Sequence, residues 1–167
     1  MTPSVLFVCL GNICRSPLTE AAFREEARRL KLDAITDSAG TGNWHIGSPP
    51  DPRAQAVALK NGVDISALRG RQVKPADFRR FTHLVAMDHD NLANLRRLAP
   101  PGATANLSLL LDHVEGRRGR PWRTPISART TVSMSPGPTS QPAPAPWPPS
   151  FSAAEVEAPS RRPRLAL

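Results

Sequence analysis

The first 112 residues alternate apolar, strand-like runs with helical patterns, and this order restricts the fold more than any other feature. Strand-like runs occupy residues 4–10, 35–39, 81–88 and 105–112. Helical patterns occupy residues 17–30, 51–62 and 89–99. Regular strand–helix alternation is typical of a parallel sheet covered by helices. The sequence therefore predicts one α/β domain on a four-stranded parallel sheet.

The composition changes after residue 116. Residues 121–167 contain 11 of the 19 prolines and show no helical period. Proline-rich segments with serine, alanine and few aliphatic residues cannot bury enough apolar surface to fold. We therefore expect a domain over residues 1–116 and a Pro/Arg/Ser-rich, disordered tail over residues 117–167.

Charge and targeting signals exclude several functions. Most of the net charge of +8 lies in residues 113–167, which carry eight basic and three acidic side chains. This region shows no nucleic-acid motif and no aromatic residues interleaved with basic ones, so no nucleic-acid partner is expected. The chain begins almost directly with an apolar strand, without a leader or a membrane-length run. We expect a cytoplasmic protein with no membrane partner.

The segment VCLGNICRSP, residues 8–17, places both cysteines of the chain and an arginine in one loop. A strand end, a glycine turn and a helix start aim backbone N–H groups at one point, which suits an oxyanion such as phosphate. Arg15 adds a planar fork of donors, and the same field favours the thiolate of Cys9. The loop predicts a nucleophilic attack by Cys9 on phosphorus, without metal or cofactor.

This loop resembles that of the low-molecular-weight protein-tyrosine phosphatases, and further resemblance runs through SAGT, HIGSPPDPRA, RQVKPADF and AMDHDNLANL. It covers residues 4–112 and implies a flavodoxin-like, three-layer α/β fold. The implied reaction is hydrolysis of phosphotyrosine proteins or small aryl phosphates through a phosphocysteine on Cys9, with Arg15 holding the phosphate. The resemblance also implies phosphate-binding and supporting positions: Leu10, Gly11, Asn12, Ile13, Cys14, Ser16, Ser38 and Trp44.

Some of these positions have a second interpretation. Cys14 resembles the partner of a reversible disulfide with Cys9, but a passive apolar role fits it equally. Trp44 resembles an aromatic rim residue, or it packs its loop onto the sheet. The histidines at 45, 83, 89 and 113 have no metal-ligand spacing. Asp88 and Asp90 are expected to cap a helix.

The chain departs from the family pattern at two places. Leu68 stands where the family has a histidine, so part of the network that supports the loop differs. The Asp-Pro loop that supplies the family's general acid, and the closing C-terminal helix, are both missing. The general acid is therefore unknown and the activity is expected to be impaired. If another residue supplies the proton, Asp112 at the end of the fourth strand is the first candidate.

The tail suggests how these parts were lost. Read in a shifted frame, the possible codons of residues 121–128 permit Val-Ala-Asp-Pro-Tyr-Phe-Gly, which resembles the missing loop. We therefore hypothesise that residues from about Arg120 onward are the product of a frameshift. Resequencing the gene across this region tests the hypothesis.

Three other functions compete with a phosphatase. A weak or inactive phosphate-binding pseudophosphatase would bind phosphotyrosine without turnover. An arsenate reductase would share the loop and fold, but it requires cysteines outside the loop that this chain lacks. A basic binding protein would use the arginines of the tail.

Overall fold

The computed structural model describes residues 2–122. Four strands form its sheet: β1 (Ser4–Cys9), β2 (Ile35–Gly40), β3 (His83–Ala86) and β4 (Asn106–Leu109). Four α-helices connect them: α1 (Arg15–Arg29), α2 (Pro52–Lys60), α3 (Asp77–Arg80) and α4 (His89–Leu98). A short 3₁₀ helix, η1 (Leu110–His113), follows β4.

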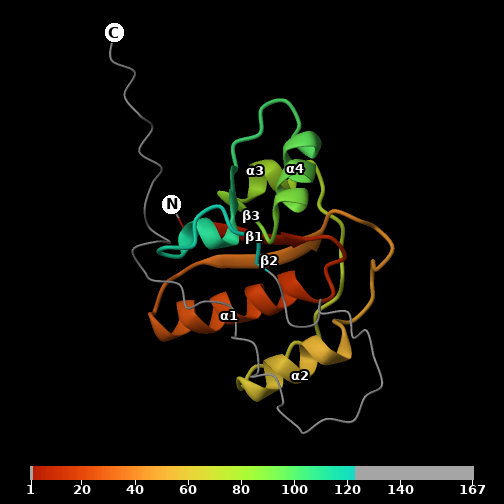
Figure 1. The fold of residues 1–167 in the computed structure, drawn as a ribbon, viewed down its shortest axis with the longest axis vertical. Coiled ribbons are helices and arrows are strands. Elements are labelled where there is room, and N and C mark those ends of the chain that lie inside the picture. Colours follow the sequence, from red (N-terminus) through yellow and green to blue (C-terminus); the bar gives the residue numbers. More distant parts are fainter. Residues whose placement is uncertain (1, 123–167) are drawn as a thin grey trace, which may run out of the picture.

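The strands are all parallel and lie in the order β2-β1-β3-β4. Helices α1 and α2 lie on one side of the sheet and α3 and α4 on the other (Figure 1). This arrangement confirms the predicted three-layer α/β fold with a four-stranded parallel sheet. Strand β1 is central, so the loop that follows it emerges between two neighbouring strands, where open α/β sheets bind their ligands.

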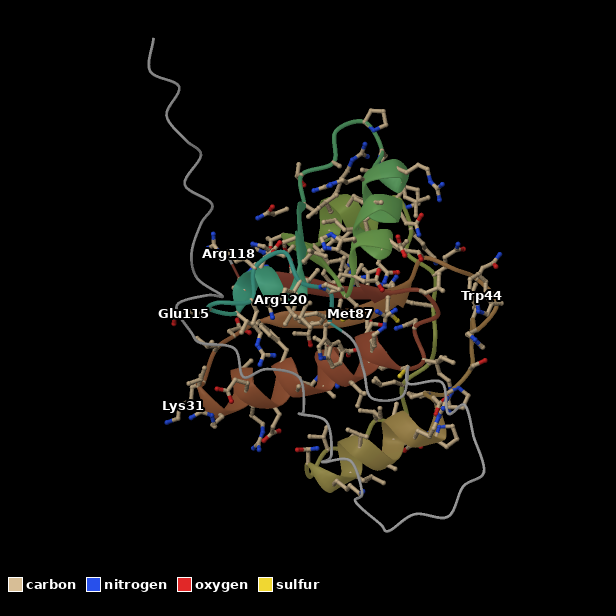
Figure 2. The ribbon with its side chains drawn as sticks, in the orientation of Figure 1. Lys31, Trp44, Met87, Glu115, Arg118 and Arg120 are labelled. Carbon is tan, nitrogen blue, oxygen red and sulfur yellow. The ribbon has the colours of Figure 1, made fainter. Side chains whose placement is uncertain are left out.

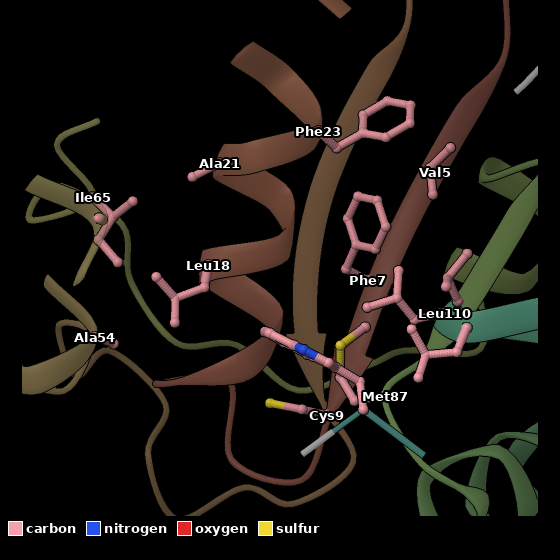
Figure 3. Packing of buried hydrophobic residues seen from close by; sticks show 14 of the residues in the cluster. Val5, Phe7, Cys9, Leu18, Ala21, Phe23, Ala54, Ile65, Met87 and Leu110 are labelled. Atoms are coloured by element: carbon pink, nitrogen blue, oxygen red, sulfur yellow. The ribbon is translucent and has the colours of Figure 1, made fainter. Parts of the chain in front are cut away.

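The core consists of one apolar cluster on each face of the sheet. Alternate β1 side chains point to opposite faces, so Phe7 and Cys9 join the cluster under α1 while Leu6 and Val8 join the cluster under α3 and α4. Figure 3 shows Phe7 and Phe23 facing each other between β1 and α1, with ring centroids 5.5 Å apart. Because β1 is buried along its whole length, its end is a rigid base for the loop.

Several local predictions are confirmed. Asp51 caps α2 by accepting the N–H of Arg53 at 2.8 Å, and Asp88 caps α4 by accepting the N–H of Asn91 at 2.8 Å.

The fourth strand is shorter than predicted, because residues 110–113 form η1 instead of extended chain. The carboxylate of Asp112 accepts the N–H of Leu109 and closes that turn.

The end of the domain differs in one detail from the sequence-based expectation. Trp122 lies beyond the predicted boundary at residue 116, yet its side chain is buried in the cluster under α1. The boundary itself stays a prediction. The predicted disordered tail and the frameshift lie almost entirely outside the described residues. Within residues 2–122, no helix is long and apolar enough to cross a membrane.

Candidate active site

The phosphate loop, defined here as residues 9–15, connects the carboxyl end of β1 to the start of α1. Three backbone hydrogen bonds fix it to neighbouring loops. Cys9 O accepts the N–H of Thr41 at 2.9 Å, Leu10 O accepts that of Gly42 at 2.8 Å, and Ile13 O accepts that of Asp51 at 2.7 Å. The loop is therefore held from outside before any ligand binds.

The sulfur of Cys9 is buried and lies among hydrogen-bonding groups. Cys9 as a whole is 3% exposed. The backbone N–H of Asn12 donates to Sγ at 3.2 Å, and the hydroxyl of Ser16 lies 3.0 Å from Sγ. The Asn12 N–H is thus a donor to the sulfur, whereas in the Ser16 contact either the hydroxyl or the thiol can donate.

Asn12 is the residue that shapes the loop. It has a positive φ of 56°, which few residues other than glycine and asparagine adopt. Its side-chain amide donates to Ser16 Oγ at 2.9 Å and to Ser38 Oγ at 3.0 Å, and its Oδ1 accepts the backbone N–H of Arg71 at 2.8 Å. These bonds hold the strained conformation that directs the Asn12 N–H at Cys9.

The network around Ser38 continues to a buried carboxylate. Ser38 Oγ donates to Glu20 Oε2 at 2.6 Å, and the other oxygen of Glu20 pairs with Arg24. Burial raises the pKa of Glu20 above its usual 4.5. Leu68 packs against the apolar cluster under α1, so its side chain adds no hydrogen bond to this network. No sequence motif indicates Glu20 as part of the site. Its only regular feature is a spacing of four residues from Ser16, which places both on one face of a helix.

Arg15 lies at the start of α1, and its guanidinium contacts a second element. Its Nη1 forms an ion pair with Asp88 Oδ2 at 2.5 Å and also donates to the backbone oxygen of Trp122 at 3.5 Å. The sequence predicts Asp88 only as the cap of α4. The structure gives it a second contact, because the same carboxylate also orients Arg15. A guanidinium held at one nitrogen keeps its remaining donors for an oxyanion.

Trp122 brings the end of the described chain to the loop. Its backbone N–H donates to the backbone oxygen of Met87, the residue directly after β3, at 2.8 Å. Its indole packs in the cluster that contains Cys9. Figure 3 shows Met87 and Cys9 close together at this end of the sheet. No pattern in the sequence indicates Trp122 as a site residue, because it lies among arginine, glycine and proline. Its large apolar side chain was the signal that could have revealed it.

Two large apolar side chains, one on the phosphate loop and one on the loop after β2, are exposed. Trp44, on the loop between β2 and α2, is 61% exposed, and Leu10 is 47% exposed. Figure 2 shows Trp44 at the outer edge of the molecule. Its exposure does not fit the interpretation in which it packs its loop onto the sheet. Its role as a rim for a substrate ring stays a prediction.

Three predictions remain to be compared with the structure: the disulfide role of Cys14, the acid role of Asp112 and the lack of a metal site. No disulfide joins Cys9 and Cys14 in the structure, so a reversible disulfide between them stays a prediction. Asp112 has both oxygens engaged, with Leu109 N–H at 3.1 Å and Gly119 N–H at 2.7 Å. In residues 2–122, no group of histidine, cysteine, aspartate or glutamate side chains is arranged to bind a metal.

Comparison with known proteins places this site in a family. The model of the low molecular weight phosphotyrosine protein phosphatases matches residues 4–125. A Schizosaccharomyces pombe low molecular weight phosphotyrosine protein phosphatase is 48% identical over 112 residues, which cover 65% of this chain and 71% of that protein. The Bacillus subtilis low molecular weight protein-tyrosine-phosphatase YfkJ is 45% identical over 114 residues, covering 67% and 73%.

A solved structure agrees with these sequence relatives. The crystal structure of YfkJ from Bacillus subtilis aligns with a TM-score of 0.66 and 43% identity, covering 70% of this chain and 74% of that one. The chain therefore belongs to the low molecular weight phosphotyrosine protein phosphatase family and is a phosphatase.

Proposed function

We propose that this phosphatase hydrolyses phosphotyrosine and related aryl phosphates through a phosphocysteine on Cys9. The observation that carries the proposal is the position of the Cys9 sulfur, 3.2 Å from the Asn12 N–H and 3.0 Å from the Ser16 hydroxyl. A buried sulfur with these neighbours is suited to act as a thiolate nucleophile.

The reaction has two displacements at phosphorus. In the first, the Cys9 thiolate forms an S–P bond while the P–O bond to the aryl group breaks, and the aryl oxygen leaves with the electron pair of that bond. In the second, water attacks phosphorus, the S–P bond breaks and inorganic phosphate leaves. The thiolate is regenerated, so the cycle requires no external electron donor or acceptor.

The loop and Arg15 neutralise the charge on the phosphoryl oxygens. The first turn of α1 contains no acidic residue, so the positive end of its dipole is not offset within that helix. Arg15 is oriented by Asp88 at one nitrogen and offers the rest of its fork to the oxygens. Preorganised charge of this kind stabilises the transition state because the groups need not reorient during the reaction.

The leaving oxygen needs a proton in the first displacement. Asp88 is paired with Arg15, and both oxygens of Asp112 accept backbone N–H groups. Neither carboxylate is therefore placed as an obvious proton donor. This observation favours a second candidate function, a pseudophosphatase that binds phosphotyrosine but turns it over poorly.

The test compares turnover and binding in Cys9→Ser. We expect no turnover of an aryl phosphate, because a neutral hydroxyl is a far weaker nucleophile, and retained binding of inorganic phosphate. Acid quenching of the wild-type reaction should trap a phosphocysteine on Cys9. Turnover by Cys9→Ser would overturn the proposal. A trapped phosphocysteine that releases no phosphate would establish the pseudophosphatase instead. The proposed protein substrates and the cytoplasmic location stay predictions.

A further inference from the structure

Residues 115–120, here called the basic loop, follow η1 and carry one glutamate and three arginines in six exposed positions. Figure 2 shows Glu115 and Arg118 at the outer edge of the molecule. Arginines near the end of α1 are paired with glutamates of the same helix. In the part of the chain that the structure describes, by contrast, no carboxylate forms an ion pair with Arg117, Arg118 or Arg120. The basic loop therefore presents positive charge that no described carboxylate neutralises by direct contact.

Hydrogen bonds fix the basic loop to the rest of the domain. The N–H of Gly119 donates to Asp112 Oδ1 at 2.7 Å, and its carbonyl oxygen accepts from His89 Nε2 at 2.9 Å. The N–H of Arg120 donates to Arg117 O at 3.2 Å and closes a turn. Gly119 has a positive φ of 72°, which glycine adopts without strain. The three charges are thus displayed from a turn that is bonded at both its N–H and its carbonyl side.

Two contacts place the basic loop beside the phosphate-binding arginine. His89, which bonds the loop, directly follows Asp88, the ion-pair partner of Arg15. Trp122, two residues after the loop ends, contacts Arg15 through its backbone oxygen at 3.5 Å. Two residues of chain span at most about 7 Å, so the backbone of Arg120 lies within that distance of Trp122. The basic loop therefore lies next to the group that would hold a substrate's phosphate.

We propose that the basic loop is a docking surface for acidic residues that flank the phosphotyrosine of a protein substrate. This inference rests on the proposed function and narrows its substrate class. An extended peptide advances about 3.3 Å per residue, so side chains two or three positions from the phosphotyrosine lie about 7–10 Å from it along the peptide. Arginine side chains that start two to five residues before Trp122 can meet carboxylates in this range.

The chemistry of the basic loop favours a peptide over other anionic partners. Its six residues are glutamate, glycine and arginine only. No aromatic side chain is present on which a nucleic-acid base could stack. No apolar side chain is present to insert into a membrane surface. What remains is the planar guanidinium group, which matches a carboxylate with two parallel hydrogen bonds.

The experiment compares two peptides that carry a non-hydrolysable phosphonate analogue of phosphotyrosine. One peptide has glutamates at the flanking positions and the other has glutamines. Dissociation constants are measured by calorimetry on the full chain, so the readout requires no turnover. The test variant is Arg117→Gln with Arg118→Gln. The matched control is Arg96→Gln with Arg97→Gln, which removes the same charge from the exposed last turn of α4.

We expect the wild type to bind the glutamate peptide about 3- to 10-fold more tightly than the glutamine peptide, because each exposed ion pair contributes a small factor. This preference should be largely lost in Arg117→Gln with Arg118→Gln and kept in the control. It should also weaken between about 0.1 M and about 1 M salt, because the Debye length falls from about 10 Å to about 3 Å. Reversing both charges, in Arg117→Glu with Arg118→Glu, should favour the glutamine peptide.

Several results would overturn the proposal. Equal affinity of the wild type for the two peptides, or no measurable binding of either, would do so. An equal loss of preference in the Arg96 and Arg97 control would reduce the effect to net charge. A loss of inorganic phosphate affinity in the Arg117 and Arg118 variant would make the loop a support of the site and not a docking surface.

Two other outcomes are separated from these. An RNA oligonucleotide that binds more tightly than the glutamate peptide and competes with it would make the basic loop a nucleic-acid surface, and would also overturn the proposal. Failure of the phosphatase function has a different signature. It is turnover by Cys9→Ser, which leaves the peptide affinities of the wild-type chain unaffected.

Discussion

Arg15 and Asp88 form an ion pair between the start of α1 and the cap of α4, with 2.5 Å from Nη1 to Oδ2. Each side chain is about a fifth exposed, at 20% and 22%. The same carboxylate accepts the N–H of Asn91 through its other oxygen. The orientation of the phosphate-binding arginine therefore depends on a helix on the opposite face of the sheet.

Asp88→Asn should lower kcat/KM for an aryl phosphate by about 10- to 100-fold, because a small misplacement of a binding group is costly in rate. Asparagine can still accept the N–H of Asn91, so thermal stability should change little. The control is Asp90→Asn, which changes an exposed charge in the first turn of the same helix. Normal kinetics in Asp88→Asn would show that Arg15 is oriented by other contacts.

Arg15→Lys should lose most phosphate binding and most turnover although it keeps the charge. A lysine ammonium is a point charge and lacks the planar fork that matches two phosphate oxygens. Phosphate affinity by calorimetry and kcat/KM together measure the loss. Kinetics close to those of the wild type would make Arg15 a structural residue only.

The leaving group should strongly affect the rate. A positioned general acid contributes about 10²- to 10⁴-fold when a phenolate with a pKa of about 10 must leave. Because the Asp-Pro loop is missing, this chain should cleave activated aryl phosphates measurably and phosphotyrosine very poorly. A variant with the tail restored to the alternate frame should recover phosphotyrosine selectively. Comparable rates on both substrates, with an acidic limb in the pH profile, would mean that another residue supplies the proton.

Gly40→Ala should damage the phosphate loop by steric contact. A Cβ at this position would lie 2.8 Å from Leu10 O and 3.2 Å from Asn12 N, both backbone atoms of the loop. We expect about 1–3 kcal/mol of lost stability and a clear fall in kcat/KM. Gly62→Ala is the control, because Gly62 has a positive φ and open space around it. It should lose stability and keep its activity. Unchanged activity in Gly40→Ala would mean that the loop relaxes freely.

Stability should fall in mild acid because of His83. Burial, and then the nearby His113, lower the pKa of His83 below its usual 6.5. The unfolded chain therefore binds a proton more readily than the folded chain, so stability present above pH 6.5 is lost as pH falls toward the folded pKa. In denaturant titrations between pH 7 and 5, His83→Gln should lose less stability than the wild type. An exposed-site control, His89→Gln, should follow the wild type. Parallel curves for His83→Gln and wild type would exclude this linkage.

The sequence predicts best those features that depend on short segments. The continuous apolar run of β1, the cap at Asp51 and the spacing of Cys9 and Arg15 are all local, and each leaves a pattern within about ten residues. The fold follows from them because strand–helix alternation admits few arrangements. Local patterns also explain one error, since the leucines at 110 and 111 fit a strand as well as they fit the 3₁₀ helix that they form.

Features that depend on distant partners could not be predicted in this way. Helix α3 has only four residues, and its Asp77 is bound by the side chain of Arg71, which also contacts Asp37 on β2. The pair between Arg15 and Asp88 joins residues 73 positions apart. Such contacts arise from the assembled tertiary structure, and no periodicity in the sequence records them.

The position of Trp122 has a consequence for the synthesis of the chain. Arg15 and the Trp122 oxygen that it contacts are separated by 107 residues. At about 5–20 residues per second, a ribosome makes Trp122 roughly 5–20 s after Arg15. The strand, loop and helix that carry the nucleophile are thus synthesised first, and the pairing of Trp122 with Met87 forms only after residue 122 has been added. During that interval the guanidinium of Arg15 lacks its contact with the Trp122 oxygen.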